Sequence, residues 1–428
     1  MSENIRSESS NSEMTDRRLK IIYFTQFYSP EPIAAAFRAT EHAELWAAED
    51  NDVTVFTSWP NYPTGRLFDG YEIERLGEEE VGCVRVLRSG SSLRPNTSLL
   101  KRVHSGLSLI VNGLRNLRRH SSVGSDYDVC LVTCGTVFFA WLGVHWARRN
   151  GIPFVVEFRD LTWRQLMATG FSEDDFKVRA VRRLELSLCE GAARVVVLTE
   201  GFRRDLVAEG VPASSIEVVP NGADIVDCHH SFRSPLRLGY FGTIGLSQDV
   251  PRTLRYASAL AAERLVASYT VVGNGAARDE AVSASSSCPD GLVTFLGGMP
   301  KDDLESLYAS VDMTVVSLRK DSAFEGTVPS KIFQSLARGV PVLYIGPKGD
   351  AAEIVKASGG GVALCGDEEA DLSDLKAFVS QHDILDVLAK MSASAVSYMG
   401  AYYTRAIMAN RLLAVLKGVA DQNKENKS

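Results

Sequence analysis

Residues 236–248 read LRLGYFGTIGLSQ, an apolar run followed by the glycines Gly242 and Gly245. The run over 236–241 has the length and composition of a buried strand. Glycines directly after such a strand let backbone N–H groups approach a phosphate closely. Glycine-rich strand exits also serve as simple packing turns, so this stretch alone leaves both interpretations open.

Similar apolar runs alternate with longer helical patterns along the whole chain. This alternation predicts parallel sheets covered by helices, and the runs form two series. The sequence therefore predicts an α/β fold with two doubly wound domains. The first series is 20–25, 52–57, 83–87, 129–133, 154–158, 194–198 and 216–219, and the second is 236–241, 268–272, 293–296, 313–317, 340–345 and 361–364.

Length and composition agree with two domains. The chain has 428 residues, 45% of them hydrophobic and 23% charged, which is enough apolar material for two full cores. Its net charge of -7 argues against a chain-wide nucleic-acid surface. The predicted parts are a disordered segment at 1–18, an N-terminal Rossmann-like domain at 19–222, a linker at 223–235, a C-terminal Rossmann-like domain at 236–395, a helix at 396–416 that could pack back on the N-terminal domain, and a disordered tail at 417–428.

Cysteine usage and the N-terminus predict a cytoplasmic protein. The seven cysteines are scattered and form no Cys-x-x-Cys pair, as expected of reduced thiols. Residues 1–18 are rich in Ser, Glu and Asn and lack the apolar core of a signal peptide. The uncharged stretch 130–147 is better explained by a buried strand that turns into a helix than by a membrane span, because it contains Thr, Gly and His.

A second functional candidate is the stretch 324–342, FEGTVPSKIFQSLARGVPV. Ser330 is a plausible N-cap of a short helix over 332–337. The loop then brings the carboxylate of Glu325 and the ammonium of Lys331 close to a helix N-terminus. Such a site suits a sugar diphosphate, with Lys331 on the phosphates and Glu325 accepting hydrogen bonds from sugar hydroxyls. The alternative is a solvated surface loop.

Two groups of metal-ligand types do not predict a metal site. Asp126-Tyr127-Asp128 resembles a metal-binding Asp-x-Asp, but it precedes its strand and so lies at the wrong end of the sheet. Residues 227–230, Asp-Cys-His-His, are adjacent ligands without a second cluster, which is poor zinc spacing. No metal and no cofactor is expected.

Seven short motifs occur in a characteristic order along the chain. They are QFYSPEP at 26–32, PNYPTG at 60–65, EFRDL at 157–161, VLTEGF at 197–202, PNGAD at 220–224, GNG at 273–275 and the segment 325–334. Over residues 19–413 the chain therefore resembles the retaining glycosyltransferases of family 4, and among them bacterial polysaccharide enzymes such as the L-fucosamine transferases. The resemblance implies a GT-B fold, with two Rossmann-like domains facing across a cleft, and a nucleotide-diphosphate sugar as donor.

The resemblance also suggests roles for single residues. Glu325 falls on the first acidic residue of the family's Glu-x7-Glu element and is expected to contact the donor sugar, while Ser330 and Lys331 match the phosphate-side segment. Gln334 replaces the second glutamate, which normally binds the ribose, and its neutral amide loses charge-assisted pairing. Leu246 stands where many relatives have a phosphate-binding arginine, which leaves Lys331 as the main cation. The other expected donor-binding residues are Gly242, Thr243, Gly245, Gln248, Gly273 and Asn274.

The acceptor is expected on the first domain. Arg159 and Asp160 follow a buried strand, so Asp160 could orient an acceptor hydroxyl while Arg159 steadies a phosphate or Asp160 itself. The alternative is a structural ion pair. Tyr28, Pro30 and Glu31 lie on the first strand-to-helix loop and are expected to form an acceptor-side wall.

The segment Arg94–Arg119 predicts a basic amphipathic helix. Its apolar side chains recur at spacings of three and four, and its basic residues have no acid nearby. The apolar stripe could pack on the first sheet, or the positive charge could suit an anionic membrane surface or a pyrophosphate-lipid acceptor. The stripe is Leu100, Val103, Leu107, Ile110, Leu114 and Leu117, and the basic residues are Lys101, Arg102, Arg115, Arg118 and Arg119.

The favoured hypothesis is a retaining transferase that moves a hexosyl or N-acetylhexosaminyl group to a hydroxyl, on a lipid-linked saccharide in bacterial cell-surface polysaccharide synthesis. It would be cytoplasmic or peripheral at the inner face of the membrane. Two alternatives stay open. One is a cytosolic natural-product glycosyltransferase. The other, prompted by Gln334 and Leu246, is a catalytically impaired protein that binds a sugar nucleotide or a partner enzyme.

Overall fold

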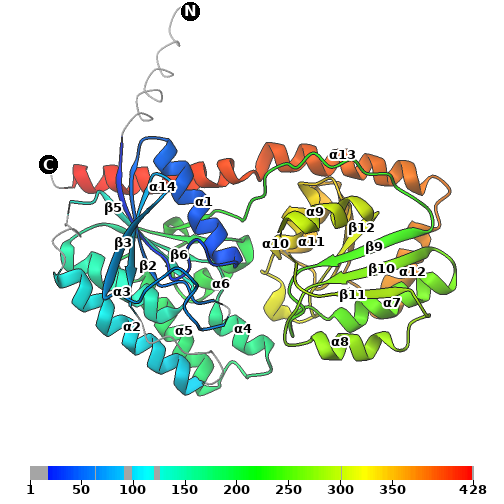
Figure 1. Ribbon diagram of the computed structural model, residues 1–428, viewed down its shortest axis with the longest axis horizontal. Helices are drawn as coiled ribbons and strands as arrows, with labels where there is room; N and C mark the ends of the chain where they lie inside the picture. Colours follow the sequence, from blue (N-terminus) through cyan, green and yellow to red (C-terminus); the bar gives the residue numbers. More distant parts are fainter. Residues whose placement is uncertain (1–17, 63, 91–98, 120–125, 300, 427–428) are drawn as a thin grey trace, which may run out of the picture. The chain divides into compact units, whose positions relative to one another are not determined.

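The computed structural model describes residues 18–62, 64–90, 99–119, 126–299 and 301–426, and within them the chain forms two sheets with helices (Figure 1). The eight-stranded sheet has the order β3-β4-β2-β1-β5-β6-β7-β8. Its central strands pair in parallel, while β3 pairs antiparallel with β4. The strands are β1 (Lys20–Phe24), β2 (Asp52–Ser58), β3 (Leu76–Val81), β4 (Val84–Ser89), β5 (Val129–Cys134), β6 (Phe154–Phe158), β7 (Arg194–Val197) and β8 (Ile216–Val218).

The helices of this first part cover both faces of the sheet. The chain passes from β1 to β2 in one direction and from β5 to β6 in the other, so the crossover helices α1 and α3 lie on opposite faces. The helices are α1 (Ala34–Ala48), α2 (Leu99–Arg119), α3 (Val137–Asn150), α4 (Thr162–Ala168), α5 (Phe176–Cys189), α6 (Glu200–Ala208) and the short η1 (Ala213–Ser215).

The six-stranded sheet has the order β11-β10-β9-β12-β13-β14, and its strands pair in parallel. Figure 1 shows α7 and α8 on one face of it and α9, α10 and α11 on the other. Its strands are β9 (Leu236–Phe241), β10 (Val266–Val272), β11 (Val293–Leu296), β12 (Met313–Ser317), β13 (Val342–Ile345) and β14 (Gly361–Leu364). Its helices are α7 (Val250–Ala262), α8 (Arg278–Ser285), α9 (Lys301–Ser310), η2 (Ser322–Phe324), α10 (Ser330–Leu336), α11 (Asp350–Ala357) and α12 (Glu368–Val379), followed by α13 (Ile384–Tyr402) and α14 (Arg405–Glu425).

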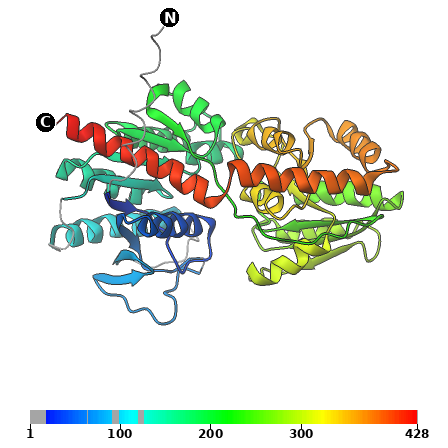
Figure 2. The same cartoon turned by 90° about the horizontal axis from the view of Figure 1, so that it is seen from above.

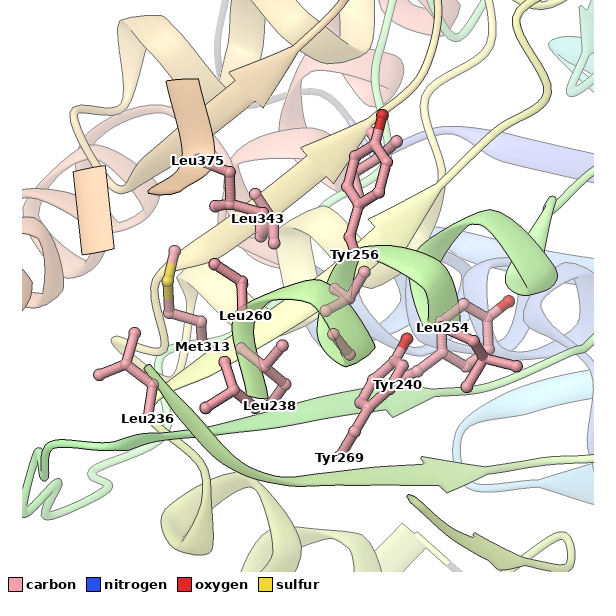
Figure 3. Close-up of a cluster of buried hydrophobic side chains, with 14 of the residues drawn as sticks. Leu236, Leu238, Tyr240, Leu254, Tyr256, Leu260, Tyr269, Met313, Leu343 and Leu375 are labelled. Carbon is pink, nitrogen blue, oxygen red and sulfur yellow. The ribbon is translucent and has the colours of Figure 1, made fainter. Parts of the chain in front are cut away.

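A buried cluster explains why the stretch that opens the second sheet folds as it does. Leu236, Leu238 and Tyr240 of β9 are almost completely buried and pack with Leu254 and Leu260 of α7 (Figure 3). Alternate residues of the strand point to this side, so a period of two places the apolar side chains on the face that α7 covers.

The strand order reverses once in each sheet. In the first sheet, the strands that follow β1 in the sequence are added on one side of it, and the strands that follow β5 are added on the other side. In the second sheet, the same reversal occurs between β9 and β12. Ligands of open α/β sheets bind at such switch points, outside the carboxyl ends of the strands. The loops that follow β9 and β12 are therefore the first place to seek a site in the second sheet.

Each strand expected from an apolar run is present, with ends within two residues of the prediction. The stretch 130–147 contains most of β5 and most of α3, which confirms the strand-then-helix interpretation. The edge strand β3, LGEEEV, was not predicted, because its acidic side chains hide the strand pattern. Charged side chains are common on edge strands, where they discourage pairing with other chains.

Contacts group the chain into two compact units, Met1–Phe158 with Leu188–Val195 and Ala409–Ser428, and Arg159–Ser187 with Val196–Met408. The last helix, α14, continues to Glu425, so the expected disordered tail at 417–428 is helical over most of its length. Burial of Val419 and Ala420 explains the continuation. The indole of Trp46 donates to the Ala409 carbonyl at 2.9 Å, which joins α14 to α1; Figure 2 shows α14 from above.

The basic amphipathic helix forms as α2, but its buried face is turned from the one predicted. Leu117 is buried and Leu114 partly buried, whereas Leu107 is 53% exposed. The contact with α3 passes instead through Gly106 and Gly113, since a Cβ there would lie within 2.4 Å of Phe138 or Leu142. Arg94 and the side chains of Lys101, Arg102 and Arg119 lie outside the described residues.

No helix in the part of the chain that the structure describes is long and apolar enough to cross a membrane.

Candidate functional site

The loops after β9 and β10 lie against each other through glycines. Gly273 (φ +141°) and Gly275 (φ +155°) leave no room for a side chain, because a Cβ would lie 2.0 Å from the Gly242 carbonyl oxygen and 2.2 Å from that of Ile244. The Ile244 N–H donates to the Asn274 carbonyl at 2.9 Å. Gly273 and Gly275 therefore allow the two loops to lie in close contact, and this contact fixes the backbone that any ligand of the turn would meet.

Lys331, in the first turn of α10, reaches across to the β9 exit. Its Nζ donates to the Tyr240 hydroxyl at 2.5 Å and to the Thr243 carbonyl at 3.0 Å, and it lies 3.9 Å from the centre of the Tyr240 ring. Gly242 makes room for the lysine stem, since a Cβ there would lie 2.7 Å from Lys331 Cε. Burial of the ammonium lowers the pKa of Lys331 to about 7.

The remainder of the turn is ordered by Gln248. Its Oε1 accepts from the Gly245 N–H at 2.9 Å, and its carbonyl accepts from the Ser317 hydroxyl at 3.1 Å. Leu246 is 57% exposed between them. Gln248 therefore shapes the loop, and Leu246 offers an apolar side chain where a basic one was the family expectation.

Glu325 follows η2, close to the exit of β12, and its side chain is exposed. Its carbonyl accepts from the Asp350 N–H at 3.0 Å. Gly349 (φ +147°) permits this contact, because a Cβ there would lie 2.1 Å from the Glu325 carbonyl oxygen. The backbone of Glu325 is thus held while its carboxylate stays available.

The next residue, Gly326, is bound to the start of α6. The Thr199 hydroxyl donates to the Gly326 carbonyl at 2.7 Å, and the Gly201 N–H donates to the Asp350 carboxylate at 2.6 Å. Arg204 adds an ion pair with Asp350 at 3.2 Å. Thr199 entered the sequence analysis only as part of the motif at 197–202, and Asp350 was not named there, although Gly349 and Asp350 at the start of α11 were an available signal.

Gln334 of α10 is bound by Arg338, which follows the end of that helix. The Arg338 guanidinium donates to the side-chain oxygen of Gln334 at 2.8 Å, pairs with Glu305 and lies over the Tyr308 ring at 4.7 Å. Because Arg338 occupies its side-chain oxygen, Gln334 would contact a ligand through its side-chain N–H groups. Ser330 is the first residue of α10, and Pro329 holds the N-cap position without a side-chain cap, so the predicted Ser330 cap is wrong.

Asp160, on the loop after β6, is accessible from solvent, yet the surrounding protein removes enough water to raise its pKa to about 6. The charge of Arg159 and a hydrogen bond from Gln165 act in the opposite direction. A carboxyl group with this pKa can exchange a proton near neutral pH.

The first loop differs from the expected acceptor wall. Tyr28 and Glu31 are at most 1% exposed. The Glu31 carboxylate accepts from the backbone N–H groups of Asn61 and Tyr62 at 3.0 and 2.9 Å, and its burial raises its pKa. Tyr28 and Glu31 therefore support the loop, whereas Pro30 is exposed.

Three buried charged side chains, Arg38, Glu157 and Arg88, were given no role by the sequence analysis. Arg38 pairs with Glu157 at 3.0 Å with both side chains almost fully buried, and Glu157 also accepts from Thr133 at 2.7 Å. Arg88, fully buried, donates to the Ser29 carbonyl. These contacts join positions far apart in the sequence, so local patterns carry little sign of them.

Within the described ranges no three His, Cys, Asp or Glu side chains gather where they could hold a metal ion. Asp126 pairs with Lys20 at 2.5 Å, and Asp128 accepts from the Lys20 N–H, both at the amino end of β1. His230 bonds to the Arg338 carbonyl at 2.7 Å.

Two family models match the chain. A model described as "Glycosyl transferase 4-like domain" matches residues 34–222, and one described as "Glycosyl transferases group 1" matches residues 235–379. A protein of Escherichia coli K12 named as the colanic acid biosynthesis glycosyl transferase WcaI is 24% identical over 339 residues, which span 75% of this chain and 82% of that protein.

Solved structures resemble the chain over nearly its full length. Sucrose-phosphate synthase from Thermosynechococcus elongatus has a TM-score of 0.73 at 12% identity, covering 94% of this chain and 99% of that one. HepE from Anabaena, solved with UDP-glucose, has a TM-score of 0.63 at 14% identity, covering 94% and 100%. At such identities the likeness shows the fold alone, and it confirms the predicted GT-B fold class.

Proposed function

Since this chain belongs to the family 4 glycosyltransferases, we propose that it transfers a sugar from a nucleotide-diphosphate sugar to a hydroxyl acceptor with retention at the anomeric carbon. The observation that carries the proposal is the position of Lys331, which lies beside the β9 turn at the switch point of the second sheet. A cation at such a place suits a diphosphate.

The reaction requires charge stabilisation on the leaving group. As the bond from the anomeric carbon to the diphosphate breaks, the acceptor oxygen forms its bond on the same face, and its proton passes to the departing phosphate oxygen. Lys331 stabilises the developing negative charge, Glu325 holds sugar hydroxyls, and Asp160 orients the acceptor hydroxyl while Arg159 steadies a phosphate. The remaining donor contacts are assigned to the turn residues Gly242, Thr243, Gly245 and Gln248, to Gly273 and Asn274, and to Ser330 and Gln334.

The test is a nucleotide-release assay with a panel of donors, beginning with UDP-sugars because HepE has been solved with UDP-glucose. We expect release that depends on a hydroxyl acceptor, with a product of unchanged anomeric configuration by NMR. An inverted product would contradict retention. Binding of nucleotide diphosphates without release or transfer from any donor would favour the catalytically impaired alternative.

For the acceptor we propose a lipid-linked saccharide of cell-surface polysaccharide synthesis, with the protein at the inner face of the membrane. The colanic acid name of the E. coli relative supports the pathway class. The exposed side of α2 supports the location, because Leu107 and Val111 are 53% and 45% exposed and Arg115 and Arg118 are exposed beside them.

Flotation with vesicles that contain anionic lipid tests the location. We expect binding that weakens with salt and with the double variant Arg115→Gln/Arg118→Gln. The variant Arg203→Gln/Lys376→Gln, which changes paired surface charges elsewhere, serves as the control. Absence of vesicle binding, together with transfer to a soluble acceptor, would favour a cytosolic natural-product glycosyltransferase instead.

A further inference from the structure

A buried carboxyl group that the proposed reaction does not use lies on α5. Glu185 is 0% exposed. Its two oxygens accept from the backbone N–H groups of Thr162 at 3.0 Å and Trp163 at 3.4 Å, at the beginning of α4. Because α4 has no side-chain cap of its own at Leu161, Glu185 satisfies N–H groups that the helix cannot satisfy internally.

Helix α4 connects two loops that carry candidate site residues. It begins directly after Arg159 and Asp160, and it packs against η2, which ends one residue before Glu325. Ala168 at the far end of α4 belongs to the same buried cluster as Phe324. A shift of α4 would therefore move both loops.

The side of α4 that faces α5 is also held by an aromatic contact. Trp163 is 2% exposed, and the guanidinium of Arg182, on α5, lies 5.8 Å from its ring centre. Arg164 lies 4.7 Å from the same ring and pairs with Asp205. Packing around Trp163 therefore restricts lateral movement of α4, while the hydrogen bonds to Glu185 hold its first turn.

We propose that Glu185 is a positioning residue, which caps α4 and thereby sets the Asp160 carboxylate and the Glu325 loop in one arrangement. The inference rests on the proposed transferase function and adds a residue that touches neither donor nor acceptor. Its physical basis is that a displacement of about 1 Å of a reacting group can cost about a hundredfold in rate.

The electrostatics give this role a distinctive signature. The pKa of Glu185 is raised to about 7, mainly by burial and also by the negative charge of Asp160, and hydrogen bonds from Thr162 and Trp163 oppose the rise. Arg159 faces Asp160, and Arg182 lies on the same helix as Glu185. The two carboxyl groups interact, so their two protonation steps belong to the pair, and the cap is strongest once both groups are charged.

The deciding variant is Glu185→Gln, because one amide oxygen can still accept from Thr162 while the charge is lost. We expect kcat to fall about tenfold or more, with the nucleotide-diphosphate Kd within about twofold of wild type. In wild type the acid limb of kcat should show two protonations, and in the variant only one, near pH 6.

The matched control is Asp312→Asn. Asp312 is also 0% exposed and accepts from two backbone N–H groups, those of Arg233 and Arg237, at the amino end of β12, where it additionally pairs with the Arg237 guanidinium. This variant should lower the melting temperature at least as much as Glu185→Gln, yet leave kcat and the shape of its pH profile unchanged below that temperature.

Hydrogen exchange provides a readout that does not depend on activity. In Glu185→Gln, exchange should rise over residues 159–168 and 322–328 and stay unchanged in β9 and β10. Unchanged exchange in both segments would overturn the proposal. A Glu185→Gln variant that keeps the wild-type kcat and still shows two protonations in its pH profile would also overturn it. If wild type transfers no sugar but the two segments respond together, the proposed function fails while the mechanical coupling through α4 stands.

Discussion

The Lys331 ammonium donates to the Tyr240 hydroxyl at 2.5 Å and lies 3.9 Å from the centre of the same ring. Tyr240 in turn donates to the Thr243 carbonyl at 2.6 Å, and Lys331 donates to that carbonyl as well. A strand residue, a turn carbonyl and a helix residue thus meet at the end of β9. This contact places the main candidate cation of the site, and it leads to three of the four predictions below.

Lys331→Met should lower kcat/KM for the nucleotide-sugar donor by about 100- to 1000-fold, because a preorganised positive group at the leaving diphosphate is removed. Steady-state kinetics measure the loss. The variant should melt no lower than wild type, since a buried ammonium with a lowered pKa is replaced by an apolar side chain. Lys376→Met, which removes a surface partner of Glu263, is the control and should keep full activity. Near-normal turnover of Lys331→Met would exclude the proposed role.

Donor binding should take up protons around neutral pH. The pKa of Lys331 is lowered to about 7 in the free protein, and a bound diphosphate would raise it again. Nucleotide-diphosphate affinity should therefore fall as pH rises above 7. Calorimetry near pH 8 in buffers of different ionisation enthalpy should show uptake of up to about one proton per nucleotide. Proton uptake that persists unchanged in Lys331→Met would assign the effect to another group.

The lowered pKa of Lys331 should also make the free energy of unfolding of the ligand-free protein depend on pH. Between pH 7 and 10.5 the folded state holds Lys331 largely neutral while the unfolded chain holds it charged. The unfolded state binds more protons in this window, so the Lys331 contribution to the free energy of unfolding rises with pH. Urea unfolding of wild type and Lys331→Met at several pH values isolates this contribution as their difference. A difference that is flat from pH 7 to 10 would contradict it.

Gly273→Ala should damage the donor turn more than its backbone angle alone explains. The added Cβ would lie 2.0 Å from the Gly242 carbonyl oxygen. Gly291→Ala is the reference for a positive φ in open space, because Gly291 has φ +75° and no atom within 4 Å of the added Cβ; at Gly273 the wider φ of +141° adds to the loss. The control should lose about 1–2 kcal/mol. Gly273→Ala should lose clearly more and also bind nucleotide diphosphate weakly; equal losses in calorimetric melting would show that the loops can separate at no cost.

Much of the donor side was predictable because its signals are local. Lys331 and Glu325 stand within one loop and one helix turn of each other, and the glycines at 242 and 273 follow strands that their own composition reveals. The partners of these residues were not predictable in the same way. Tyr240 lies 91 positions before Lys331 in the sequence, and Thr199 lies 127 positions before Gly326. Nothing in either local pattern specifies such a pairing.

The orientation of α2 illustrates the same limit. Spacings of three and four correctly predicted a helix, but they do not determine which side of it is buried, because that depends on the neighbouring elements. Gly106 and Gly113 decide that choice, because their lack of a side chain lets Phe138 and Leu142 of α3 approach closely. Leu107 is consequently exposed although the pattern placed it on the stripe.

Residues 236–248, by themselves, determined a buried strand and a glycine turn, since the period of two and the bend after Phe241 are short-range consequences of side-chain size and polarity. Whether that turn serves packing or ligand binding could not follow from the same letters. The tertiary structure decided that Gly273 and Gly275 serve the close contact of two loops, while Gly242 makes room for a lysine from another helix. The physical reason is that steric exclusion and buried charge depend on neighbours that only the folded chain brings together.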